Sequence, residues 1–117
     1  MQRQKLKTKK KMSDTIRKIL GMAPSVDLGE LIKNGATILD VRTKEEFSQG
    51  HIKGALNISV DKLPQNLSKL KNKENTLITC CASGMRSASA KAFLSSNGYT
   101  NVYNGGSWIN LKRKYDL

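Results

Sequence analysis

Two adjacent cysteines and a nearby arginine form the stretch of this sequence best suited to chemistry. Cys80 and Cys81 end a short apolar run, and Arg86 follows after four small or flexible residues, 82–85. Neighbouring Cα atoms lie about 3.8 Å apart, closer than the roughly 4.4 Å or more found in disulfides. We therefore expect two free thiols. A nearby arginine lowers the pKa of a thiol and favours the nucleophilic thiolate. The stretch thus predicts covalent catalysis by cysteine without a histidine base, because His51, the only histidine, lies elsewhere.

The strand and the loop around these residues distinguish the two thiols. Side chains alternate along a strand, so in TLITC (76–80) Cys80 shares a face with Ile78 and is expected to lie in the core. Cys81 is expected just past the strand, in a loop that leads into a helix starting at Arg86. Free N–H groups at the start of a helix stabilise anions, so we expect the loop amides to stabilise a Cys81 thiolate. The alternative is an inert thiol at the end of a strand.

The rest of the chain predicts an α/β domain with a small, mainly parallel central sheet. Apolar runs typical of buried strands occur at 36–41, 55–60, 76–80 and 101–104. Helices are expected at 13–22, 27–34, 44–49, 62–70, 86–96 and near the C-terminus. The alternation predicts four to five strands flanked by helices on both faces. Ligands of such sheets bind at the carboxyl ends of the strands, where Cys81, Asp40 and Arg42 all fall.

Several polar residues and glycines have structural interpretations. Asp40 and Arg42 are expected to support this edge of the sheet as a charge pair. The alternatives are proton donation by Asp40 and substrate attraction by Arg42. Thr43 and Glu46 fit a capping box at the start of a helix. The glycine pair 105–106 is expected to form a turn after the last strand.

Three blocks of the sequence resemble the rhodanese family. CASGMRS (81–87) is similar to the active-site loop of single-domain rhodaneses, whose common form is C-x-S-G-x-R-S. ILDVRTKEEFSQGHIKGALNI (38–58) resembles the first signature of the family, and FLSSNGYTNVYNGGSW (93–108) resembles its closing segment. The blocks follow one another in the family order and cover about residues 26–110, which makes the resemblance specific. Trp108 departs from the pattern because it follows the glycine pair more closely than is common in the family.

The resemblance implies a rhodanese-like fold and a sulfurtransferase activity. Cys81 matches the catalytic cysteine, which becomes a persulfide, and Arg86 matches a residue that helps to bind an anionic sulfur donor such as thiosulfate. A thiol or a protein acceptor would then take the sulfur. The backbone amides that match the cradle around the outer sulfur belong to Ala82, Ser83, Gly84, Met85, Arg86 and Ser87. No external cofactor is implied. A zinc site is not expected either, because His51 is the only histidine and the cysteine pair lacks the C-x-x-C spacing of structural sites.

Two other functions remain open at this point. The same loop could belong to a non-catalytic sulfur carrier or protein-binding module. Counted from Cys80, five residues precede Arg86, and Cys-x5-Arg is the signature of cysteine phosphatases and related arsenate-reductase-like enzymes. We favour Cys81 because it aligns with the family loop and because Cys80 has the buried phase of its strand.

The chain has 117 residues and a formal charge of +12, much of it near the start. Residues 1–20 contain eight lysines and arginines against one acid. We expect a basic N-terminal tail at 1–12 and a single domain at 13–117. The tail could bind nucleic acid weakly through phosphate contacts. No run approaches the roughly 18 apolar residues of a membrane span, and free thiols suit a reducing compartment. We therefore expect a cytoplasmic monomer that does not bind membranes.

Overall fold

The structure, a computed structural model, describes residues 26–117. The expected tail at 1–12 and the expected helix at 13–22 lie outside the described residues. The elements in chain order are α2 (Leu28–Lys33), β1 (Thr37–Asp40), α3 (Lys44–Ser48), β2 (Leu56–Asn57), the 3-10 helix η1 (Val60–Lys69), β3 (Leu77–Cys81), α4 (Met85–Ser96), β4 (Val102–Ser107) and α5 (Trp108–Tyr115).

The four strands form one sheet in the order β2-β1-β3-β4, and every neighbouring pair is parallel. The predicted α/β class is thus confirmed. The central strand β3 is buried along its whole length, as is usual for parallel strands that are covered on both faces. The run 55–60 was expected to form a longer strand, but only two of its residues pair with β1 before η1 begins. Because all four strands are parallel, the strand ends that carry the candidate residues lie together at one edge of the sheet.

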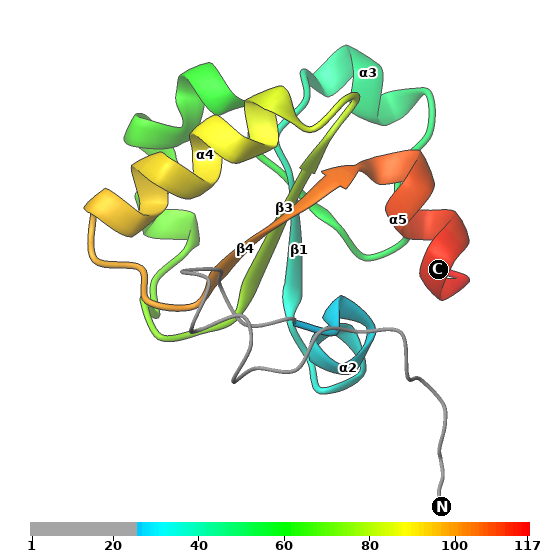
Figure 1. The fold of residues 1–117 in the computed structure, drawn as a ribbon. Coiled ribbons are helices and arrows are strands. Elements are labelled where there is room, and N and C mark those ends of the chain that lie inside the picture. The colour runs from blue at the N-terminus through cyan, green and yellow to red at the C-terminus, as the bar shows by residue number, and fades with distance from the viewer. Residues whose placement is uncertain (1–25) are drawn as a thin grey trace, which may run out of the picture.

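Helices cover both faces of the sheet and bury two separate apolar clusters (Figure 1). On one face, η1 and α4 pack on a cluster that includes Leu39, Leu63 and Leu94. On the other face, α2 and α5 pack on a cluster built around Ile38 and Ile78. Ile38 and Leu39 are neighbours in β1 and enter opposite clusters, as the alternation of side chains along a strand requires.

The last strand differs from the prediction at its glycine pair. β4 continues through both glycines instead of ending before a turn, and its register with β3 shifts between Thr79 and Cys81. Only Gly106 has a positive φ, of 77°. At Gly105 a Cβ would lie 2.8 Å from Ile78 Cγ2 and 2.9 Å from the Thr79 carbonyl oxygen, so no larger residue fits. The pair forms a β-bulge that brings β4 close to β3.

Local sequence signals fix the helix starts near the candidate site. The predicted capping box of α3 is confirmed, because Thr43 Oγ1 accepts from the Glu46 N–H and Glu46 accepts from the Thr43 N–H. α4 begins at Met85, one residue earlier than predicted, with Gly84 as its N-cap at a φ of 103°. A positive φ at this position favours glycine. The loop between β3 and α4 is therefore only three residues long.

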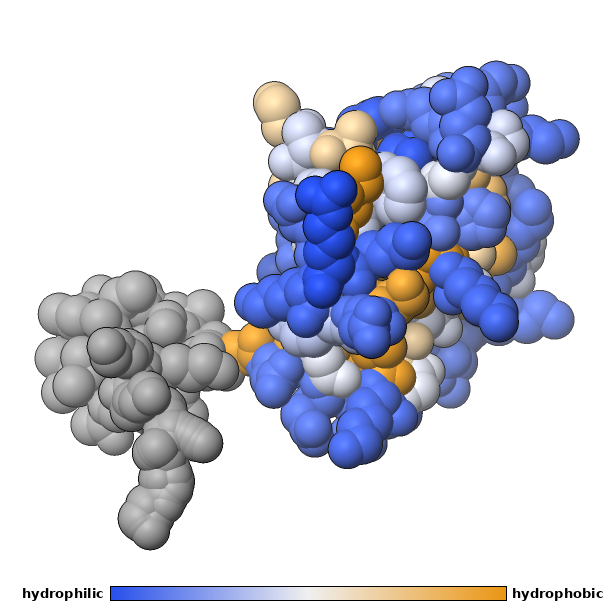
Figure 2. Space-filling view, turned by 90° about the vertical axis from the view of Figure 1, so that its right-hand side faces the viewer, coloured by the Kyte–Doolittle hydropathy of each residue, from blue (hydrophilic) through white to orange (hydrophobic). Residues whose placement is uncertain are grey.

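Few large apolar side chains are exposed in the described part of the chain, namely Val26, Met85 and Ile109. Figure 2 shows the side on the right of Figure 1, where hydrophobic residues are visible only in places among hydrophilic ones. None of the helices within residues 26–117 is both long enough and apolar enough to cross a membrane.

Candidate active site

Cys81 is the last residue of β3, and its side chain is fully buried. We expected it one residue past the strand, in the loop. The difference arises because Cys81 pairs with Ser107 after the bulge in β4, which extends the ladder by one residue. The side chain points to the same face of the sheet as Leu77, beneath the start of α4.

The loop after β3 surrounds the sulfur of Cys81 with hydrogen-bond donors. The N–H of Gly84 donates to Sγ at 3.0 Å, and the N–H of Ser87 donates to it at 3.4 Å. The thiol donates to Ser87 Oγ at 3.4 Å. Both amides belong to the N-terminus of α4, where N–H groups have no partner within the helix. This arrangement stabilises a negative charge on sulfur.

Two opposing effects act on the pKa of Cys81. Burial favours the neutral thiol and raises the pKa. The Ser87 hydroxyl, when its proton turns to the sulfur, and the N–H groups of Ser87, Gly84 and Ser83 favour the thiolate, and together these contacts lower the pKa below its ordinary value. The thiol is therefore prepared for ionisation by peptide groups and not by a neighbouring base.

Cys80 lies on the opposite face of β3, in the cluster beneath α5. It is fully buried, as predicted, and burial raises its pKa to about 12. A thiol in that environment stays neutral near pH 7 and cannot act as a nucleophile there. The geometry therefore gives no support to a Cys80-centred phosphatase loop. Both cysteines are free, and within the described part of the chain no metal-binding group of three or more His, Cys, Asp or Glu occurs.

Arg86 forms an ion pair with Glu46 of α3. Its guanidinium donates to both carboxylate oxygens of Glu46, at 2.7 and 3.0 Å. The hydrogen bond from Arg86 holds the pKa of Glu46 at about 2, and the carboxylate in turn raises the pKa of Arg86. Glu46 was predicted only as a capping residue. Because it lies 40 positions from Arg86, no local spacing could have revealed the pairing.

Asp40 and Arg42 form a buried ion pair of 2.7 Å at the end of β1. The Arg42 guanidinium also donates to the backbone carbonyl of Gly50 at 2.8 Å and lies 4.5 Å from the ring of Trp108. All of these contacts are internal, and Arg42 is 4% exposed. The pair supports the edge of the sheet and does not present a charge to a ligand.

The remaining predicted residues form the outer part of the loop. Ala82 and Ser83 are exposed, and Met85 is 78% exposed, which is unusual for a large apolar side chain. Asn104 was not predicted. Its Oδ1 accepts from Ser87 Oγ at 2.6 Å, which connects β4 to the cradle around Cys81. The sequence carries no separate signal for this contact, since Asn104 is a polar residue before two glycines.

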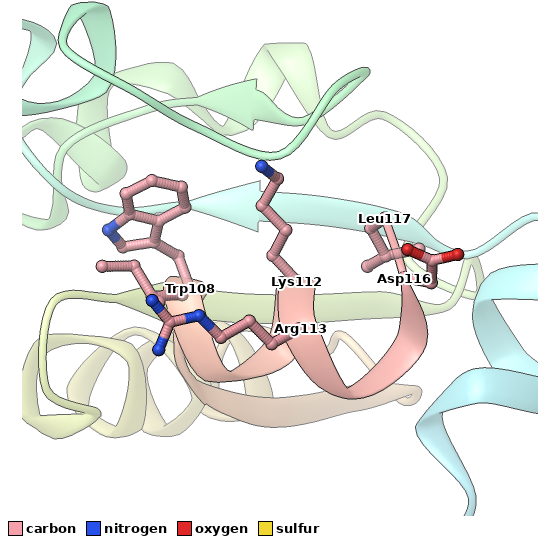
Figure 3. A pocket seen from close by; sticks show the side chains of 6 residues that line it. Trp108, Lys112, Arg113, Asp116 and Leu117 are labelled. Carbon is pink, nitrogen blue, oxygen red and sulfur yellow. The ribbon is translucent and has the colours of Figure 1, made fainter.

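A separate hollow of about 350 Å³ lies beside α5 (Figure 3). It is lined by Trp108, Ile109, Lys112, Arg113, Asp116 and Leu117. None of these residues belongs to the loop after β3, so the hollow is not part of the cysteine site.

Comparisons with known proteins agree with this geometry. Thiosulfate sulfurtransferase PspE of Escherichia coli is 36% identical over 69 residues, which cover 58% of this chain and 66% of PspE, slightly less than two thirds of its length. Thiosulfate sulfurtransferase GlpE of Pseudomonas aeruginosa is 32% identical over 92 residues, covering 79% of each chain. The solved structure of the human single-domain sulfurtransferase TSTD1 superposes with a TM-score of 0.64 at 33% identity, covering 79% of this chain and 97% of TSTD1.

The family model described as rhodanese-like domain matches residues 26–107. This range contains β1 to β4, the loop after β3 and both partners of each ion pair described above. The chain therefore belongs to the rhodanese-like family.

Proposed function

We propose that the protein is a sulfurtransferase that carries sulfur as a persulfide on Cys81. The donor is a small anion with a transferable outer sulfur, such as thiosulfate, and the acceptor is a thiol of a small molecule or a protein. The relatives named thiosulfate sulfurtransferase, at 32–36% identity, support this reaction class. Arg86 and the amides of residues 82–87 are the groups available to bind the donor.

The reaction proceeds in two balanced displacements. The Cys81 thiolate attacks the outer sulfur of thiosulfate, an S–S bond forms to Sγ, and sulfite leaves with the electron pair of the broken bond. An acceptor thiolate then attacks the outer sulfur of the persulfide. The new S–S bond forms on the acceptor, and the Cys81 thiolate leaves and is regenerated. No external oxidant or reductant is consumed in either step.

One observation carries the proposal, the convergence of the Gly84 and Ser87 amides on the sulfur of Cys81. These donors are fixed by the start of α4, so their orientation costs nothing at the moment of reaction. They stabilise the thiolate before attack and again when it leaves. A cysteine of the core, such as Cys80, has no such set of backbone donors in the described structure.

Access to the sulfur requires movement of the loop, because Cys81 is fully buried. Ala82 and Ser83 directly follow Cys81 and are exposed to solvent. We therefore expect a small displacement of these two residues to open a route for the donor to the sulfur. Glu46 also competes with an anionic donor for the guanidinium of Arg86. Donor binding therefore involves partial release of that ion pair.

Intact-mass measurement after exposure to thiosulfate tests the proposal. We expect the wild-type chain to gain one sulfur atom and to release it on addition of a thiol. Cys81→Ser should gain no sulfur, whereas Cys80→Ala should gain it as the wild type does. Sulfur retained by Cys81→Ser, or lost with Cys80→Ala alone, would contradict the assignment. Repeated turnover with thiosulfate and excess thiol distinguishes an enzyme from a carrier that delivers its sulfur once.

A further inference from the structure

We propose that Asn104 is a positioning residue for Cys81. It binds the hydroxyl proton of Ser87, keeps that proton away from the sulfur of Cys81, and so limits the fraction of the sulfur that is ionised. The inference rests on the proposed function, since the ionisation of Cys81 matters only if its sulfur reacts. It adds a residue of β4 that acts on the sulfur through a side chain of α4.

The hydroxyl of Ser87 has one proton but lies within hydrogen-bond distance of several atoms that could accept it. Ser87 is fully buried, and its Oγ lies 3.4 Å from Cys81 Sγ, 3.1 Å from the Gly84 carbonyl oxygen and 2.6 Å from Asn104 Oδ1. A hydroxyl has one proton to donate and two lone pairs to accept with. The contact with Asn104 is the shortest, so the proton lies on that side. Oγ then offers a lone pair to the sulfur.

The backbone fixes the orientation of the Asn104 amide. Oδ1 accepts from the Gly106 N–H at 2.9 Å, and Nδ2 donates to the Gly84 carbonyl oxygen at 3.4 Å. Rotating the amide by half a turn would place Nδ2 against the N–H of Gly106, donor against donor. The oxygen of Asn104, and not its nitrogen, therefore faces Ser87.

The chain of hydrogen bonds from Cys81 through Ser87 to Asn104, unlike the backbone amides, suits a neutral sulfur better than a charged one. In the thiol form, the S–H of Cys81 donates to Ser87 Oγ, and Ser87 donates to Asn104, so every group has a partner. In the thiolate form, the sulfur needs a donor where Ser87 offers a lone pair. If the Ser87 proton turns to the sulfur, two oxygens are left 2.6 Å apart without a proton between them. Either arrangement of the thiolate loses one hydrogen bond.

The charged groups around the site do not account for this effect. Arg86 on α4 is paired with Glu46 on α3, and Asp40 at the end of β1 is paired with Arg42. Cys80, on the other face of β3, stays neutral at pH 7. Asn104 itself is uncharged, so replacing it with an apolar residue changes hydrogen bonds and leaves the charges of the site as they are.

A pH titration of the Cys81 thiolate by its ultraviolet absorbance tests the inference. The full chain is used with Cys80→Ala, so that a single thiol is observed. We expect Asn104→Leu to lower the apparent pKa of Cys81 by about one unit, a roughly tenfold gain in thiolate below the pKa, as befits one hydrogen bond to a charged group. Asn104→Asp should raise the apparent pKa, because a carboxylate holds the Ser87 proton more tightly and repels the thiolate.

The same titration in a Ser87→Ala background separates positioning from other effects. Without the hydroxyl, Asn104→Leu should no longer shift the titration of Cys81. A shift that persists there, or an unchanged or raised pKa with Asn104→Leu, would overturn the inference. Because Asn104 is exposed, its variants should fold, and circular dichroism checks this. The titration needs no sulfur transfer, so failure of the mass experiment would remove the proposed function without changing this result.

Discussion

The two faces of β3 give neighbouring cysteines opposite chemical characters. Cys80 packs against aliphatic side chains such as Ile38 and Ile78, and its pKa is raised to about 12. Cys81, the next residue, accepts hydrogen bonds from two backbone amides, and its pKa is lowered although it too has no exposed surface. A thiol without exposed surface can therefore still be prepared for ionisation. The turn into α4 supplies peptide donors to one face of the strand only, and on the other face burial acts on Cys80 without such donors.

Among the variants that test this difference between the two thiols, Gly84→Ala should have the largest effect, on the activity of Cys81. Gly84 has a φ of 103°, a conformation that strains any residue with a Cβ, and its N–H lies 3.0 Å from the sulfur. Relief of the strain would turn this amide away from Cys81. We expect kcat/KM for thiosulfate to fall about 100-fold, at the lower end of the effect of losing a preorganised donor.

Gly35→Ala is the matched control for that experiment. Gly35 has a φ of 97°, and a Cβ there would meet no atom within 4 Å, so the backbone strain is comparable but remote from the cysteine loop. This variant should lose about 1 kcal/mol of stability and keep its activity. Equal activity of the two variants would mean that the Gly84 amide contributes little to Cys81.

Cys80→Ser tests the other face of the strand. A hydroxyl at this buried position lies among mainly aliphatic side chains, and the nearby Asp40 and Arg42 are already paired with each other, so the hydroxyl gains no new partner. We expect the free energy of unfolding to fall by about 1–3 kcal/mol in urea denaturation, with sulfur loading retained. Cys80→Ala removes the polar atom and should cost less than the serine variant if the missing partner is the cause. Loss of loading in folded Cys80→Ala would contradict the division of roles between the two thiols.

Glu46→Gln should produce the smallest change, in the affinity for the donor. Glutamine keeps the capping box of α3, because its side chain can also accept from the Thr43 N–H. It removes the negative charge that competes for Arg86. The pair is about one third exposed, so we expect KM for thiosulfate to fall only two- to threefold. The control is Glu45→Gln, which removes a neighbouring negative charge and keeps the capping residues; it should leave KM nearly unchanged. A rise in KM with Glu46→Gln would contradict the prediction, because it would show that Arg86 needs its partner to bind the donor.

The sequence was sufficient for those features that depend on local patterns. Strand alternation placed Cys80 in the core, and the spacing of Thr43 and Glu46 identified the capping box. The small residues after Cys81 indicated a tight turn into α4. Each of these inferences uses residues within a few positions of one another, for which backbone geometry is the dominant constraint.

The features that were missed depend on distant segments of the chain. Cys81 lies inside the strand because of its pairing with Ser107, and Arg86 is held by Glu46 from another helix. The role of Asn104 depends on the bulge at Gly105, which is set by the approach of β4 to Ile78. A single sequence gives the types of these residues, but their contacts follow from tertiary packing.

The buried ion pair at the end of β1 also has a practical consequence. Trp108 is the only tryptophan of the chain, and its ring lies 4.5 Å from the Arg42 guanidinium. Indole emission responds to a cation held against the ring, so the intrinsic fluorescence of the protein should report whether this contact is intact. The molecule thus contains its own label-free probe for the docking of α5 onto the sheet.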